Sequence, residues 1–371
     1  MDQSGWIKPP GGFYSTTEDW LARANFPNKT PEYTQFHYDD DDTGASRPKG
    51  LESCVHWKFT AEMQRKPPPA FVVVIPDGRV WGAKGAVITP DNKLLWDVSV
   101  DYGITARSHP VFTEKRLPPV QSRKDTAAVL TFCASQYYYH WMFDVLPRIN
   151  LLRRKKIPID KFILNFNGSL PFQMETLSRL GIPRAAILAC HKLFHLQARR
   201  LVVPSLSGYT GHMPKWSCEF LRKEFLPLNK AQASCKRLYI SRENAGSRKV
   251  INDDQVASIL AKYGFEKMVL ETLSVTKQAQ LFASAEAIIS PHGGGLTNLV
   301  FCRPGTKVLE FFSPNYVNVL YWVLSNHVEL DYYYLIGEGK RPAEHVDPHI
   351  VGDDIMVNLN QLNEILTMME M

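Results

Sequence analysis

Three side chains with acid–base and charge-pairing chemistry recur every four residues in the segment 137–156. His140, Asp144 and Arg148 stand at i, i+4 and i+8, so a helix over this segment places them on one face. A carboxylate can hold an imidazole in one tautomer or accept the proton itself, so His140 and Asp144 could act together as a general base. The alternative is a polar helix face on which Asp144 and Arg148 form an ordinary ion pair. The spacing leaves both interpretations open.

A cationic loop follows the predicted strand 237–241. Arg242, Arg248 and Lys249 are interspersed there with small polar residues. Guanidinium groups bind phosphate oxygens in bidentate geometry, which suits a phosphate-bearing ligand. The alternative is a solvated basic loop.

A glycine turn follows another predicted strand, 287–290. The sequence Ser290-Pro291-His292-Gly293-Gly294-Gly295-Leu296-Thr297-Asn298 leads from a strand into a helix start, where backbone N–H groups can approach an anion closely. It is not a Walker loop, because the Gly-Lys-Ser/Thr ending is missing, and Asn298 stands at the third glycine position of G-x-G-x-x-G. An esterase oxyanion loop would require a G-x-S-x-G elbow, which the sequence lacks.

A carboxylate interrupts the apolar strand predicted over 307–312. Glu310 needs a partner in such a strand. A pair of ribose hydroxyls and an internal arginine are the two candidates.

The elements that position these residues form two α/β halves. Strands and helices alternate over 125–235 and again over 236–371, which predicts two parallel sheets and a C-terminal helix. Short β-type runs between 70 and 100 predict an antiparallel meander. We therefore expect an irregular, β-rich N-terminal extension over 1–124 in front of the two α/β domains.

The composition is that of a globular protein with a slight excess of positive charge. The 371 residues carry 43 Lys and Arg against 37 Asp and Glu, a formal charge of +6. This charge suits a phosphate-bearing ligand or an anionic membrane surface, and the basic run 153–156 is either a solvated helix end or a contact with anionic lipid. No C-x-x-C pair occurs, and the four aspartates 39–42 are typical of a solvated turn, so we expect no metal site. The apolar run 71–75 is far too short to span a bilayer and the N-terminus lacks a secretory signal, which predicts a cytosolic protein.

Taken in order, the four motifs resemble those of glycosyltransferases of family 61, which include bacterial capsular polysaccharide biosynthesis proteins. The resemblance covers roughly residues 125–335, and Gly294 stands where the family usually has the alanine of His-Gly-Ala-Gly-Leu. The segment 1–120 carries no motif of the family. The matching segments are Tyr139-His140-Trp141-Met142-Phe143-Asp144-Val145-Leu146-Pro147-Arg148, Tyr239-Ile240-Ser241-Arg242, the glycine turn Ser290 to Asn298, and Pro304-Gly305 through Glu310.

The resemblance implies a GT-B-like α/β fold, with two Rossmann-like domains and an inter-domain cleft. It implies an inverting, metal-independent transferase without cofactor, which moves a sugar from a nucleotide-sugar donor to a hydroxyl of a glycan or lipid-linked acceptor in capsule or exopolysaccharide biosynthesis. Such an enzyme would act in the cytoplasm, in peripheral contact with the inner face of the membrane, and without nucleic acid. The alternative is a catalytically inactive relative that binds nucleotide sugar as a scaffold.

The resemblance also implies roles for individual residues. Without a metal, the charge of a departing nucleoside diphosphate must be met by fixed cations and N–H dipoles. Asp144 is expected to be the base, with His140 orienting it or binding the acceptor, and the reverse assignment stays open. Tyr139 and Arg148 are expected to contact the acceptor. The expected donor-binding residues are Arg242, Arg248, His292, Gly293, Gly294, Gly295, Leu296, Asn298 and Glu310, the last through the ribose hydroxyls.

Overall fold

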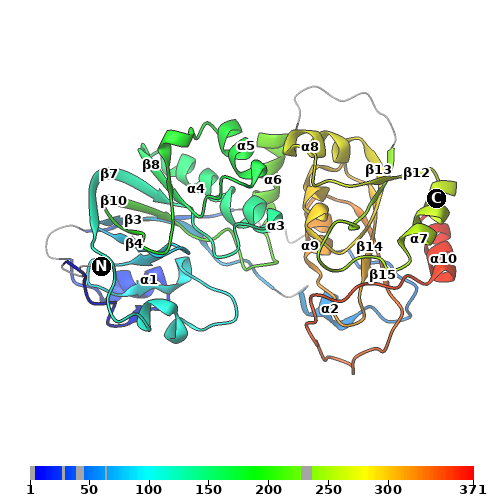
Figure 1. Cartoon of the computed structure of the whole chain (residues 1–371), viewed down its shortest axis with the longest axis horizontal. Coiled ribbons are helices and arrows are strands. Elements are labelled where there is room, and N and C mark those ends of the chain that lie inside the picture. The colour runs from blue at the N-terminus through cyan, green and yellow to red at the C-terminus, as the bar shows by residue number, and fades with distance from the viewer. Residues whose placement is uncertain (1–4, 27–29, 39–45, 63–64, 227–235) are drawn as a thin grey trace. The chain divides into compact units, whose positions relative to one another are not determined.

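The chain folds into two compact units, each built from two separate segments. A computed structural model describes residues 5–26, 30–38, 46–62, 65–226 and 236–371. Unit 1 consists of 1–39 and 68–210, and unit 2 of 40–67 and 211–371 (Figure 1). The aspartate run 39–42, which we expect to be a solvated turn, lies outside the described residues.

Unit 1 contains a ten-stranded mixed sheet. The strands follow the order β1-β6-β5-β4-β10-β7-β8-β9, with β3 on β10 and β2 on β3. The parallel part, β10-β7-β8-β9, is the expected α/β portion, and β4, β5 and β6 pair antiparallel as the meander predicts. The strands are β1 Phe13–Tyr14, β2 Glu32–Phe36, β3 Ala70–Pro76, β4 Arg79–Trp81, β5 Ala86–Ile88, β6 Leu94–Leu95, β7 Gln121–Val129, β8 Lys161–Leu164, β9 Ile187–Ala189 and β10 His195–Pro204.

The expected separate extension over 1–124 is therefore not what the structure shows. The strand β7 crosses the expected boundary at 124/125 and pairs with β10, which also pairs with β3 and β4. Residues 46–62, from the same extension, belong to unit 2. The expected boundary at 235/236 differs from the observed division after residue 210. Strand pairing between distant segments decides these boundaries, and a change in local pattern does not reveal it.

The core of unit 1 is formed by apolar side chains of its buried strands. Phe71, Val73 and Ile75 alternate on one face of β3 and pack in a single cluster with Val129 and Leu201. The helices of this unit are α1 Thr17–Arg23, α3 Tyr138–His140, α4 Arg148–Lys155 and α5 Pro171–Arg179, with a π-helical turn η4 at Trp141–Val145. Short 3₁₀ turns lie at η1 Trp96–Val98, η2 Ala106–Ser108, η3 Pro110–Phe112 and η5 Arg184–Ala186.

Unit 2 contains a five-stranded parallel sheet in the order β12-β11-β13-β14-β15. Numbered from its first strand, this order is 2-1-3-4-5, that of an open doubly wound sheet. The strands are β11 Lys236–Ile240, β12 Phe265–Met268, β13 Ala285–Pro291, β14 Lys307–Phe312 and β15 Asp331–Ile336. The parallel sheet expected for the C-terminal half is confirmed.

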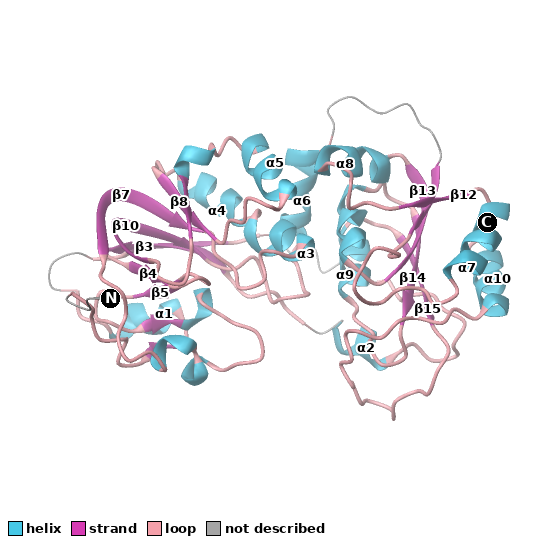
Figure 2. Cartoon of the chain, in the orientation of Figure 1, coloured by secondary structure: helices cyan, strands magenta, loops and turns pink. Residues whose placement is uncertain are grey.

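Helices cover both faces of this sheet (Figure 2). Residues of α7 and α10, among them Leu260 and Ile365, share a core cluster with Ile289 and Leu309 of the sheet. Figure 1 shows α8 and α9 on the opposite face. The helices are α2 Trp57–Glu62, α6 Lys215–Phe225, α7 Asp253–Lys262, α8 Val275–Ala283, α9 Leu320–His327, α10 Leu359–Met368 and the 3₁₀ helix η6 Gly294–Phe301.

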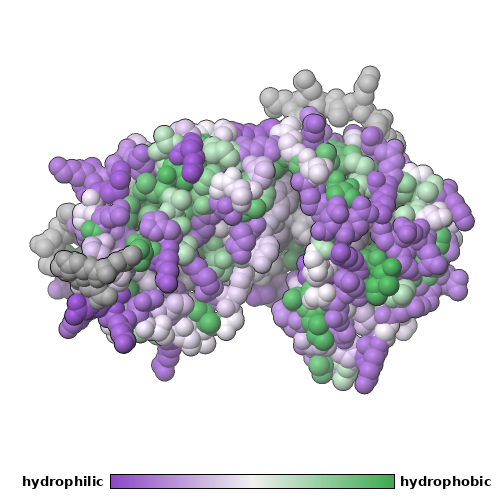
Figure 3. Space-filling view, in the orientation of Figure 1, coloured by the Kyte–Doolittle hydropathy of each residue, from purple (hydrophilic) through white to green (hydrophobic). Residues whose placement is uncertain are grey.

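None of the described helices is long and apolar enough to cross a bilayer. On the face shown in Figure 3, apolar surface is divided into small patches by polar side chains. The described residues also contain no group of three or more His, Cys, Asp or Glu side chains arranged to hold a metal ion.

Candidate functional site

The helix expected over 137–156 is interrupted by a wide turn. Pro147 has no N–H to donate to the preceding turn, and the Leu146 amide donates instead to the Trp141 carbonyl five residues back, at 3.1 Å. The result is the π-helical turn η4, which follows His140 directly and contains Asp144. Such turns are rare and are often found at functional sites.

The expected contact between His140 and Asp144 is present. His140 Nδ1 lies 2.7 Å from Asp144 Oδ2. The Asp144 side chain is only 5% exposed, whereas that of His140 is 19% exposed. Burial raises the pKa of Asp144, while the His140 hydrogen bond and the charge of Arg148 lower it. The imidazole is therefore the more accessible of the two groups, and both assignments of the base stay open.

Tyr102 lies next to His140 and Asp144 as a third polar side chain, and the sequence motifs did not indicate it. Its hydroxyl lies 3.1 Å from His140 Nδ1 and 3.3 Å from Nε2, and the Phe132 ring packs against the same imidazole. Tyr102 comes from the loop after η1 and is 45% exposed. Only the fold brings this loop to His140, so spacing along the chain could not reveal the contact.

Arg148 is not available to an acceptor, contrary to our expectation. Its side chain is fully buried. The guanidinium donates at 2.8–3.0 Å to four backbone carbonyls at the carboxyl ends of β7 and β10. These carbonyls belong to Val129, Thr131, Pro204 and Ser205. Arg148 therefore joins two neighbouring strands beneath the dyad, which is a structural role.

Tyr139 is also buried, so the expected acceptor contact is not supported by its placement. Its ring packs edge-on against His140 at 5.1 Å and against Phe143 at 5.2 Å. Tyr137, two residues earlier, is by contrast 62% exposed.

The basic run 153–156 is largely engaged within unit 1. Arg154 lies over the rings of Phe36 and Tyr38, at 4.8 and 4.6 Å from their centroids. Lys155 donates to Thr34 Oγ1 at 2.9 Å. Arg153, Arg154 and Lys156 nevertheless remain exposed, so both interpretations of the run stay open.

The second candidate site lies in unit 2, where the strand order reverses. From β11 the chain moves to β12 on one side and then crosses to β13 on the other. In open parallel sheets the crevice at such a reversal, at the carboxyl ends of the strands, is the usual place for a ligand. Arg242 follows β11 there, and His292 and Gly293 follow β13.

Arg242 lies directly over Gly293. A Cβ atom at position 293 would stand 2.0 Å from Arg242 Nη1, so a glycine is required for this approach. Arg242 Nη2 donates to the Ser247 carbonyl at 2.9 Å, but its Nε is buried without a hydrogen-bond partner among the described residues. Burial lowers the pKa of Arg242, and the charge of Arg248 lowers it further. A bound anion would accept a hydrogen bond from this unpartnered Nε–H and would offset the charges of Arg242 and Arg248.

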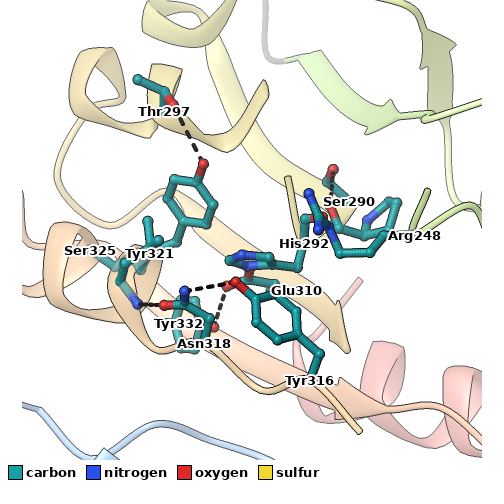
Figure 4. Close-up of polar contacts among 12 residues, drawn as sticks. Arg248, Ser290, His292, Thr297, Glu310, Tyr316, Asn318, Tyr321, Ser325 and Tyr332 are labelled. Carbon is teal, nitrogen blue, oxygen red and sulfur yellow. Dashed lines mark hydrogen bonds and ion pairs between the residues drawn. The ribbon is translucent and has the colours of Figure 1, made fainter. Parts of the chain in front are cut away.

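Arg248 lies beside the same turn. Its Nε donates to the His292 carbonyl at 3.1 Å, Nη1 donates to the Val351 carbonyl, and the guanidinium lies 5.6 Å from the Tyr316 ring. Figure 4 shows Arg248 next to His292. The two arginines that we expected to bind phosphate are therefore placed at one turn.

The residues of the glycine turn that we expected to bind the sugar donor fall into two groups. Gly294 and Gly295 are partly exposed at the start of η6, where the first N–H groups have no partner within the helix. The Leu296 amide, in contrast, donates to the Gly293 carbonyl at 3.0 Å. Asn298 is fully buried, and its amide donates to Gln278 Oε1 at 2.7 Å. We therefore correct the expectation for Leu296 and Asn298, which stabilise the turn from within.

Glu310 is not placed to bind ribose, which corrects another expectation. It is fully buried, and its two oxygens lie 2.5 Å from His292 Nδ1 and 2.5 Å from the Tyr332 hydroxyl. Burial raises the pKa of Glu310 well above its ordinary value. Burial and the positive charges of Arg248, Arg242 and Lys58 lower the pKa of His292 well below its ordinary value. The partner of the carboxylate is neither of the two candidates that the sequence suggested.

Lys58 is a third cation that the motifs missed. It comes from α2, far from the other motifs in sequence, and its Nζ donates to the Val317 carbonyl at 2.8 Å. It also forms an ion pair with Asp347. The tyrosine next to Val317, Tyr316, packs against the His292 ring at 5.5 Å, so Lys58 belongs to the surroundings of the same turn.

Comparison with known proteins adds one finding. Residues 138–309 match the family model described as Glycosyltransferase 61. The match runs from α3 to β14 and includes His140, Asp144, Arg242 and the glycine turn. No curated protein matches the chain. This region, which is less than half of the chain, is therefore similar to the glycosyltransferases of family 61.

Proposed function

We propose that the protein is an inverting, metal-independent glycosyltransferase. It transfers a sugar from a nucleoside diphosphate sugar to a hydroxyl of a glycan or lipid-linked saccharide in polysaccharide biosynthesis. The observation that carries the proposal is the anion site of unit 2, where the Arg242 guanidinium lies over Gly293 with a buried, unpartnered Nε.

The donor role follows from the charge that develops as the glycosidic bond breaks. The departing nucleoside diphosphate gains negative charge, which preorganised donors must stabilise. Arg242, Arg248 and the first amides of η6 are such donors and belong to the chain itself. Each charge-assisted hydrogen bond contributes about 1.5–3 kcal/mol.

The acceptor role follows from the dyad of unit 1. Inversion by a single displacement requires a base that removes the proton of the attacking hydroxyl. With its Nδ1 held by Asp144, the His140 ring has Nε2, which lies 3.3 Å from the Tyr102 hydroxyl, as the nitrogen that accepts this proton. Asp144 fixes the tautomer and stabilises the imidazolium that forms.

A turnover and binding screen over UDP- and GDP-sugars tests the proposal. We expect one donor to raise the melting temperature and to be consumed in the presence of chelator. Arg242→Ala should abolish the shift, whereas Arg303→Ala should retain it, because the exposed Arg303 side chain donates to the Ala283 carbonyl in the same unit. If no nucleotide sugar binds, the proposal fails. Binding without turnover on any acceptor would instead favour the inactive scaffold.

A further inference from the structure

A cluster of charged side chains fixes the chain where it leaves β11 of unit 2. The ammonium group of Lys267, on β12, lies 2.6 Å from Glu243 Oε2 and 2.6 Å from Asp253 Oδ2. Asp253, the first residue of α7, also accepts hydrogen bonds from the hydroxyls of Tyr239 and Ser241. The Glu243 amide donates to Ser241 Oγ at 3.2 Å. Asp253 and Lys267 therefore bind three alternate residues of one chain segment.

The two residues between these three point to the other side of the chain. Successive side chains of an extended segment alternate between two faces, and the Ser241 amide continues the ladder of β11 by donating to the Met268 carbonyl at 2.9 Å. A Cβ atom at Gly295 would stand 3.3 Å from Ile240 Cγ2, and the Arg242 guanidinium lies over the glycine turn itself. Contacts that fix one face of the segment therefore also fix the direction in which Arg242 points.

The hydrogen bonds of Arg242 with described residues stay within its own loop. Nη2 donates to the Ser247 carbonyl at 2.9 Å, and the Arg242 carbonyl accepts from the Ala245 amide at 2.9 Å. At its far end the loop is tied to the His292 carbonyl through Arg248. Its near end, which carries Arg242, is tied to the sheet by the charged cluster.

We propose that Lys267 and Asp253 are positioning residues of the anion site. They hold the segment 239–243 in the course that places Arg242 over Gly293, and neither of them contacts the diphosphate. The inference rests on the proposed function, since it concerns the same site. Asp253 makes the inference specific: by charge alone its removal would strengthen the binding of an anion, whereas the loss of positioning weakens it.

Calorimetry with UDP and GDP on the full chain tests the role of Lys267. Lys267→Met should weaken the affinity by about tenfold, the lower end of what one hydrogen bond to a charged group contributes. Lys267→Arg should recover most of this loss, because a guanidinium can also bridge two carboxylates. The matched control is Arg237→Met, since Arg237 pairs with Glu286 at the opposite end of β11. At physiological ionic strength this control should change the affinity by less than about twofold.

Asp253→Ala separates positioning from charge. We expect it to weaken the affinity for UDP and GDP by about tenfold. Asp254→Ala is the control, because it removes the same charge from the next residue of the helix, which is exposed, and it should not weaken binding. Urea unfolding checks that all variants are folded.

Nitrogen-15 NMR of the arginine side chains gives a readout that needs no ligand. The Nε–H resonance of Arg242 is identified by its loss in Arg242→Ala. It should shift in Lys267→Met and in Asp253→Ala, because the guanidinium leaves its place over Gly293, and it should keep its position in Asp254→Ala.

The outcomes are distinct from those of the proposed function. Wild-type or higher affinity in either Lys267→Met or Asp253→Ala, while Arg242→Ala abolishes binding, overturns the inference and leaves the anion site standing. An unchanged Arg242 resonance in both variants, or no recovery in Lys267→Arg, overturns it as well. If the wild type binds neither nucleotide, the proposed function fails and the inference fails with it.

Discussion

Replacement of Gly293 by alanine should disrupt the proposed anion site while leaving the fold intact. The new Cβ would stand 2.0 Å from Arg242 Nη1, whereas ordinary contacts begin near 3.4 Å, so the guanidinium must move by about 1.4 Å. The backbone can accept alanine, because the φ angle of Gly293 is 173°, in the extended range. The clashing atoms belong to the far end of a flexible side chain, which limits the effect on stability.

The size of the effect follows from the hydrogen bonds that the displaced guanidinium would lose. One or two charge-assisted bonds to a diphosphate contribute about 1.5–3 kcal/mol each. The dissociation constant for UDP or GDP should therefore rise at least about tenfold, and about 150-fold if a strong bond is lost. The free energy of unfolding in urea should change by less than about 1 kcal/mol.

Calorimetry and urea unfolding on matched variants check this prediction. Gly246→Ala is the control, because a Cβ there meets nothing within 4 Å in the same cationic loop. In an Arg242→Ala background, Gly293→Ala should cause no further loss, since both changes act through one side chain. Wild-type nucleotide affinity in Gly293→Ala, with a normal unfolding curve, would refute the role of Arg242 as an anion ligand.

Three further predictions concern unit 1. Asp144→Asn should lower turnover by about 100-fold or more without changing donor affinity, as measured by initial rates and calorimetry, and wild-type turnover would remove Asp144 from the mechanism. Arg148→Leu should lower the free energy of unfolding by about 3–5 kcal/mol, because four carbonyls lose their donor. The control Arg199→Leu changes an exposed residue and should alter the free energy of unfolding by less than about 0.5 kcal/mol. Equal urea midpoints for the two variants would contradict this prediction. Burial raises the pKa of Asp97 to about 6, so the stabilisation by the protonated carboxyl is present below pH 4 and is lost as the pH rises through 6. The free energy of unfolding of the wild type relative to Asp97→Asn should therefore fall by up to roughly 3 kcal/mol between pH 4 and 7. A difference that stays constant with pH would refute this prediction.

The parallel sheet of unit 2 and the gathering of the motif residues at one of its edges were predictable from the sequence. Each motif there follows a strand directly, and parallel strands bring their carboxyl ends to one edge. The contact between His140 and Asp144 was predictable for a similar reason, since it depends on one helical turn. In both cases the position of each residue within its own strand or helix determines which residues come together.

Partners that depend on tertiary packing were not predictable. The helical spacing of Arg148 gave no indication that its face meets the carbonyl ends of β7 and β10. Glu310 finds Tyr332 on a neighbouring strand, and nothing near either residue in sequence marks the pair. Lys58 and Tyr102 come from segments without motifs and reach their sites only through the fold.

The discontinuity of unit 2 has a consequence for how the protein is made. Phe59 of α2 is fully buried against Trp322, Tyr332 and Tyr334. A ribosome that adds about 5–20 residues per second synthesises Phe59 about 13 to 55 s before it synthesises these aromatic partners. Unit 1, which ends at residue 210, can fold during that interval, while Phe59 in α2 has not yet met its aromatic partners. Phe59 is therefore expected to become buried only after the ribosome has passed residue 334.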